Sequence, residues 1–359
     1  MAGSASIGSL VVDRLKTRGE SRWPYLALGT VAILATMVIA VAQGAVAIPA
    51  PLLLEMIWAR LPFASVNPSW PATFETIVFE IRLPRVVLGA LVGAALATAG
   101  ATYQGLFRNP LADPYLLGVA SGAALGAVLA MSLALPVAVL GLELVPLAAF
   151  LGALATVALV YLIGRVGRTT PMTTLLLAGV ALGSFFSSVT YTLMLVESNR
   201  LHAIFSWLLG GLYLSNWQQV LAISPYVAGG TAVIWLCARA LNVMQLEEEQ
   251  AQQLGLDVDR LKLFLVAAAS LVTAAAVSVA GLIGFVGLIV PHLVRLIWGP
   301  DHRFLLPMSA LIGAVFLMLA DTLARTAFAP NELPVGIVTA LCGVPFFIYL
   351  LRQKKREVF

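Results

Sequence analysis

Long apolar runs alternate with short polar clusters along most of this chain. Each run holds about 20 residues with few or no charges, which is enough to cross a hydrocarbon core of about 30 Å as a helix. The pattern predicts an all-α, polytopic membrane protein with about ten transmembrane helices. The predicted spans are residues 25–46, 85–106, 115–135, 143–164, 172–194, 217–240, 262–281, 283–299, 304–324 and 333–351.

The stretch 260–299 leaves two interpretations open. It is just long enough for two crossings of about 20 residues each, joined by a turn at Gly281–Gly284. A re-entrant pair of helices is the alternative.

Composition supports the membrane assignment, because 60% of the residues are hydrophobic and 11% are charged. Soluble proteins have fewer hydrophobic and more charged residues. The 21 Lys and Arg residues lie mostly in short clusters between apolar runs, a pattern typical of membrane topology and not of a nucleic-acid-binding surface. With the N-terminus placed in the cytoplasm, about three quarters of these cations fall on the cytoplasmic side. Both termini are therefore expected in the cytoplasm, which requires an even number of spans.

One membrane domain is expected. Residues 1–24 form a polar, basic N-terminal segment on the cytoplasmic side, residues 25–351 form the transmembrane domain, and residues 352–359 form a basic cytoplasmic tail. The first apolar run exceeds 20 residues, which is longer than the apolar part of a signal peptide. We therefore expect an uncleaved first span.

The second and third predicted spans are separated by the helix breakers Asn109-Pro110 and Asp113-Pro114. Glycines recur every four residues in both spans, at Gly89 and Gly93 and again at Gly118, Gly122 and Gly126. Helix faces made of such small residues allow two backbones to pack closely in lipid. We therefore expect these two helices to form a packed pair.

Three motifs resemble those of one protein family. Residues 82–126 contain R-L-P-R, then Q-G-L-F-R-N-P-L-A-D-P and a glycine-rich continuation. Residues 284–295 read GFVGLIVPHLVR and are followed by D-H-R at 301–303, and residues 320–336 read ADTLARTAFAPNELPVG, with Pro345 after them. Together they resemble the permease subunit of type II ATP-binding-cassette importers, which carry iron chelates, haem and cobalamin.

The loop 241–262 is rich in acidic residues, and Gly255 is expected to break it into two short helices. The resemblance implies that it is the coupling loop that inserts into the ATPase subunit, with Glu247 in place of the usual glycine. From charge alone, a solvated acidic loop is the alternative. The residues that match the coupling motif are Leu246, Glu248, Glu249, Ala251, Leu254 and Gly255.

Three arginines are expected at the outer membrane surface. Arg82 and Arg85 precede the second span, and Arg325 ends the ninth. In the family, arginines at these positions bind glutamates of the substrate-binding protein, whereas snorkelling to the interface is the general alternative. Asp321 stands four residues before Arg325 and is expected to pair with it along the helix.

The fifth span and residues 199–207 resemble the helices that line the family's translocation pathway. Arg200 is a candidate for binding a carboxylate of the cargo and His202 for transient ligation of iron, with interfacial anchoring as the alternative for both. The small polar residues of the span also suit helix packing. The candidate pathway residues are Thr173, Thr174, Ser184, Ser187, Ser188, Arg200 and His202.

No catalytic residue, metal site or cofactor is predicted in this chain. The phosphate-binding motif G-x-x-x-x-G-K-[ST] is absent, so ATP and Mg²⁺ are expected on a partner ATPase. The resemblance implies a homodimer of permeases, two ATP-binding-cassette subunits and a periplasmic or lipid-anchored binding protein, with no nucleic acid. The implied location is the cytoplasmic (inner) membrane of a bacterium or archaeon.

The expected cargo is an iron-siderophore complex, with haem and cobalamin left open because permeases for all three share these motifs. An ion-gradient-driven secondary transporter is the alternative from another class. It predicts acidic residues buried near the middle of the membrane and no acidic coupling loop.

Overall fold

The computed structural model describes residues 22–44, 46–60, 70–133, 138–139, 142–167 and 169–358. Nearly all of the predicted N-terminal segment 1–24 lies outside the described residues. The described part is helical except for loops and a short antiparallel pair, β1 (Ala138–Val139) and β2 (Leu142–Glu143). The helices are α2 (Trp23–Ala42), α3 (Ala50–Ala59), α4 (Ala72–Glu75), η2 (Thr76–Arg82), α5 (Leu83–Leu106), η3 (Pro114–Leu117), α6 (Val119–Ser132), α7 (Leu144–Gly164), α8 (Met172–Val196), η4 (Ser198–Arg200), α9 (Leu201–Leu208), α10 (Trp217–Leu236), α11 (Ala238–Val243), α12 (Glu248–Gln253), α13 (Val258–Ala280), α14 (Val286–Trp298), α15 (His302–Thr326) and α16 (Val335–Val358).

The predicted all-α, polytopic membrane architecture is confirmed, and each predicted span coincides with a helix. Among the described residues, seven helices are long and apolar enough to cross a membrane. Helices α6 and α14 have 14 and 13 residues, which corresponds to a rise of about 20 Å each. In the stretch 260–299, α13 is therefore long and apolar enough to cross a bilayer, whereas α14 is shorter than a full crossing requires.

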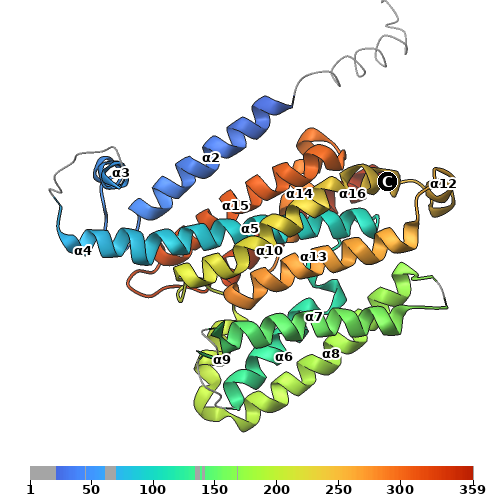
Figure 1. The fold of residues 1–359 in the computed structure, drawn as a ribbon, viewed down its shortest axis with the longest axis horizontal. Helices are drawn as coiled ribbons and strands as arrows, with labels where there is room; N and C mark the ends of the chain where they lie inside the picture. Colours follow the sequence, from blue (N-terminus) through green and yellow to red (C-terminus); the bar gives the residue numbers. More distant parts are fainter. Residues whose placement is uncertain are drawn as a thin grey trace, which may run out of the picture.

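Helix α5 lies at the centre of the molecule, packed against α10, α13, α14 and α15, while α6, α7, α8 and α9 form a second layer below (Figure 1). Helix α13 joins the layers because it contacts both α5 and α7. Short α12 and the C-terminal end of α16 lie at one end of the molecule, and α3 and α4 lie at the other (Figure 1).

The glycine faces pack closely, but not as the expected pair. A Cβ atom at Gly93 would overlap the backbone of Gly313 in α15, and one at Gly126 would overlap the backbone of Ala148 in α7. The main partner of α5 is thus α15, and that of α6 is α7. The prediction that α5 and α6 pack on each other is wrong, because the breaker segment between them carries the chain into the other layer.

The second span begins earlier than predicted. Helix α4, the π-helix η2 and α5 form one continuous helix from Ala72 to Leu106, 35 residues long. Pro84 supplies no N–H for a regular helical bond, and the turns just before it are π-helical, a common accommodation of such a break. Arg82 and Arg85 consequently lie inside a helix and not at its end.

Candidate functional site

A groove of about 870 Å³ with several hydroxyl groups in its lining runs between α6, α8 and η3. Three predicted pathway residues, Ser184, Ser187 and Ser188, line its α8 side, and Ser121 faces them from α6. We call this cavity the serine groove. Its lining also includes Asp113, Tyr115, Thr190 and Tyr191, and no lysine or arginine.

Asp113 and Tyr115 are partly buried and line the serine groove from the start of η3. The Asp113 carboxylate accepts a hydrogen bond from the backbone N–H of Tyr115 at 2.8 Å and so caps η3. Burial raises the pKa of Asp113 to about 6, against the opposing effect of that hydrogen bond. The Tyr115 hydroxyl donates to the carbonyl of Ile283 at 2.9 Å and accepts from its N–H at 3.2 Å. This side of the groove is thereby tied to the turn between α13 and α14.

The other predicted pathway residues do not join this groove. Thr173 is exposed near the start of α8, and the Thr174 hydroxyl donates to the carbonyls of Gly164 and Pro171. Arg200 and His202 line a different cavity of about 840 Å³ beside α9. The pathway role of these four residues therefore stays a prediction.

Arg200 binds the carbonyl of Met131 near the end of α6, a position where a cation also complements the helix dipole. His202 is exposed. The described residues contain no group of three His, Cys, Asp or Glu side chains placed to hold a metal ion. The arrangement explains Arg200 as a helix cap and gives His202 no companion for iron.

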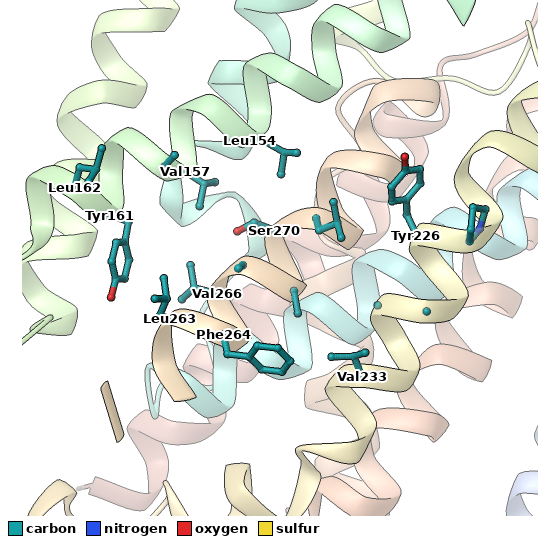
Figure 2. A pocket seen from close by; sticks show the side chains of 17 residues that line it. Leu154, Val157, Tyr161, Leu162, Tyr226, Val233, Leu263, Phe264, Val266 and Ser270 are labelled. Carbon is teal, nitrogen blue, oxygen red and sulfur yellow. The ribbon is translucent and has the colours of Figure 1, made fainter. Parts of the chain in front are cut away.

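An apolar cavity of about 810 Å³ lies between α7, α10 and α13 (Figure 2). Leu154 and Val157 of α7 face Val266 and Ser270 of α13 across it. The one hydroxyl at its centre, that of Ser270, already shares a 2.6 Å hydrogen bond with Tyr103. This cavity offers few polar partners to a cargo, so the serine groove is the better candidate pathway.

The predicted coupling loop contains a single short helix, α12, followed directly by long α13. Glu248 and Glu249 lie in the first turn of α12, where the helix dipole favours negative charge. Gly255 has φ +83 and open space around its α-carbon. Gly255 thus makes the expected break, but the segment beyond it is the first part of a spanning helix.

The apolar residues of this loop point in different directions. Leu246 and Leu254 are 44% and 67% exposed, whereas Ala251 is 1% exposed and belongs to the core of its own chain. A helix of six residues presents one face inward and one outward, which accounts for this difference. The coupling role of all three residues stays a prediction.

Arg82, Arg85 and Arg325 are buried, with 6%, 8% and 6% of their surfaces exposed. Arg85 forms an ion pair with Asp321 at 2.9 Å and another with the half-exposed Glu332 at 2.8 Å. Arg325 pairs with Asp321 at 3.1 Å, as the i,i+4 spacing predicted. We call these five residues the arginine cluster.

Two of these arginines cap the end of α2. Arg82 donates to the carbonyls of Val41 and Ala42 at 2.8 and 3.2 Å, and Arg325 donates to the carbonyl of Ala40 at 2.9 Å. These carbonyls belong to the last turn of α2, where no backbone N–H of the helix is available to bond them. The expected exposure of the three arginines is therefore wrong, and their docking role stays a prediction.

Sequence reasoning missed Asp113, Tyr115 and Ser121 as groove residues. The available signal was the breaker sequence N-P-L-A-D-P, which placed an acid between two membrane helices. An acid in that setting is a candidate functional residue.

A bundle of span-length apolar helices with an open groove is the architecture expected of a multi-pass transport permease. The model of the FecCD transport family matches residues 32–353. This chain belongs to the FecCD transport family, and the predicted resemblance to importer permeases is confirmed.

Individual relatives agree with this membership. The chain is 47% identical to a cobalamin import system permease protein of Halobacterium salinarum, over 99% of this chain and 97% of that protein. It is 40% identical to a hemin transport system permease protein of Yersinia pestis, over 78% of this chain and 84% of that protein. A solved structure described as an inward-facing metal-chelate type ABC transporter matches with a TM-score of 0.79 and 30% identity, over 92% of this chain and 99% of that one.

Proposed function

We propose that this chain is the membrane permease of a binding-protein-dependent importer powered by a separate ATPase. The serine groove carries the proposal, because it brings hydroxyl groups of α6 and α8 together along one open cavity. In this proposal the chain binds and guides cargo, and the partner subunit binds ATP and Mg²⁺.

The proposed ATPase contact is the outer face of the loop 241–262. Leu246 and Leu254 expose apolar surface there, and Glu249 lies beside them in the first turn of α12. An exposed apolar surface bordered by charge is typical of a docking site. Truncating both leucines to Ala is expected to abolish co-purification of the ATPase, whereas the same change at the membrane-facing Leu236 is not.

We further propose that a second copy of the chain covers α8. In the apolar stretch with which α8 could span the membrane, only 17% of the residues are buried, compared with 67% for α13. Yet α8 carries the serines of the groove. A second copy related by a two-fold axis would place two such faces around one pathway. Cysteine cross-linking from Ser188 to its own copy tests this arrangement.

The proposed cargo is cobalamin, in place of the iron-siderophore complex expected from sequence. Two observations support it: the cobalamin permease relative matches nearly the whole chain at higher identity than the hemin relative, and the groove is lined by hydroxyl groups without a cation. Hydroxyls suit the amide-rich periphery of a corrinoid by hydrogen bonding. Competition for uptake among cobalamin, haem and a ferric siderophore decides the cargo, and uptake blocked by unlabelled siderophore but not by cobalamin would reverse the assignment.

We propose that the binding protein docks at the end of the molecule formed by α3, α4 and the arginine cluster. Glu332 is the half-exposed member of that cluster, so a carboxylate from the binding protein would replace it at Arg85. The opposite end, where Arg22 at the start of α2 lies 3.8 Å from Asp301 at the start of α15, is placed in the cytoplasm with both termini. Labelling of single cysteines from each side of the membrane tests this orientation.

A further inference from the structure

Helix α12 cannot hold its position alone. It has six residues, and isolated helices of fewer than about 12 residues are unstable in water. Among the described elements, its main packing partner is α13. The position of α12 therefore depends on what links it to that helix.

An ion pair between a buried lysine and a half-exposed glutamate makes the link. The ammonium group of Lys262 lies 2.7 Å from a carboxylate oxygen of Glu248, and the Lys262 side chain is 3% exposed. A buried ammonium is tolerated only when it is paired. Ala251, on the next turn of α12, is 1% exposed and belongs to the hydrophobic core, and α12 as a whole contacts α13. Lys262 and this packing together hold α12 against α13.

The same part of α13 also holds the start of α8. Asp259 lies one turn before Lys262, and its carboxylate accepts a hydrogen bond from the backbone N–H of Thr170 at 3.2 Å. Thr170 is 2% exposed and stands two residues before the start of α8. The Thr170 hydroxyl donates to the Tyr161 hydroxyl of α7 at 3.2 Å. The first turns of α13 thus contact the loop helix on one side and the segment that leads into the groove-lining helix α8 on the other.

We propose that the first turns of α13 form a joint that connects α12 to α8, with Lys262 and Asp259 as its positioning residues. A displacement of α12 by the ATPase passes through the Glu248–Lys262 pair to α13, and through Asp259 to the end of α8 that leads into the serine groove. This inference rests on the proposed function for its role in transport. The joint itself is a property of the isolated chain and can be tested there.

The first experiment measures amide hydrogen exchange in the purified permease. Lys262→Met is expected to speed exchange in residues 249–255 by about 5-fold, because the half-exposed Glu248 loses its partner and α12 loses its link to α13. Lys262→Arg is expected to keep the protection. Arg260→Met is the matched control, since Arg260 is 88% exposed and pairs only with nearby Asp257. Should Lys262→Met not fold, Glu248→Gln at its half-exposed position serves as the second variant. Exchange in Lys262→Met or Glu248→Gln equal to that of Arg260→Met overturns the joint.

The Asp259 contact has its own reporter, the amide of Thr170. Asp259→Ala is expected to speed exchange of that amide at least about 10-fold, because the amide loses its acceptor. Asp259→Asn, which retains an acceptor oxygen, is expected to protect it. Unchanged exchange at Thr170 in Asp259→Ala contradicts the second half of the joint.

The second experiment measures cargo uptake per ATP hydrolysed by the complete importer in proteoliposomes. Lys262→Met is expected to lower this ratio at least about 10-fold, with recovery in Lys262→Arg and no loss in Arg260→Met. A normal ratio in Lys262→Met overturns the role of the joint in coupling. Absence of ATP-driven uptake in the wild-type protein contradicts the proposed function instead, and the exchange results still decide the joint.

Discussion

Replacing Asp321 with Asn tests whether the arginine cluster stabilises the fold. The Asp321 carboxylate is 2% exposed and lies between two buried guanidinium groups, those of Arg85 at 2.9 Å and Arg325 at 3.1 Å. An amide of the same shape accepts hydrogen bonds but carries no charge. The variant therefore leaves two buried cations facing each other, with Glu332 as the remaining acid beside Arg85.

The expected loss is large for a single atom replacement. Removing one partner of a buried ion pair costs about 3–5 kcal/mol. The pair between Arg60 and Glu75 spans 3.6 Å, with side chains 58% and 39% exposed, and pairs of that kind contribute about 0–1 kcal/mol. Glu75→Gln is thus a matched control with the same chemistry in an exposed setting.

Thermal unfolding in detergent, followed by intrinsic tryptophan fluorescence, measures the difference. Asp321→Asn should unfold many degrees below wild type and Glu75→Gln close to it. Adding Arg325→Met to Asp321→Asn should recover part of the loss, because it removes one uncompensated buried cation. Equal unfolding temperatures for Asp321→Asn and Glu75→Gln would refute the structural role of the cluster and leave docking as the reason for its arginines.

Two further predictions concern single positions. Gly255→Val should strain a backbone with φ +83 by about 1–3 kcal/mol and abolish uptake while the permease still assembles. The control Gly299→Val, at φ +94 with equally open surroundings, should keep uptake. Normal transport by Gly255→Val would refute the coupling role of the loop. Asp113→Asn should become more stable relative to wild type as pH rises. The reason is that burial raises the pKa of Asp113 to about 6, so the folded protein binds more protons than the unfolded chain between about pH 4 and 6 and loses stability across that window. Melting curves at pH 5 and pH 7.5 should show a relative gain of about 1 kcal/mol, and a pH-independent difference would contradict it.

The membrane helices were predictable because apolar runs of span length have few alternatives in lipid. All ten predicted spans became helices for that reason. The start of the second span was not predictable. In the sequence Pro84 indicates a helix start, but in the structure it follows a π-helical turn. The helices that pack against Gly93 and Gly126 were also not predictable, because a glycine face predicts close packing but does not indicate which helix the neighbour is.

The candidate site was predictable in part. Ser184, Ser187 and Ser188 share one face of α8 and all line the serine groove, while their role in the pathway stays a prediction. The burial of Arg82 and Arg325 depends on the end of α2, which is distant in sequence, so no local pattern reveals it. The burial of Ala251 depends on how α12 packs on the rest of the chain, and a motif shared among relatives does not specify that orientation.

ATP-dependent uptake in proteoliposomes tests the central claim most directly. The permease is reconstituted with its ATPase and binding protein, and radiolabelled cobalamin is followed with an ionophore present to collapse ion gradients. The account predicts accumulation that requires ATP, the ATPase and the binding protein, and that persists without any gradient. Accumulation by the permease alone, driven by a proton or sodium gradient and indifferent to ATP, would contradict it and favour a secondary transporter.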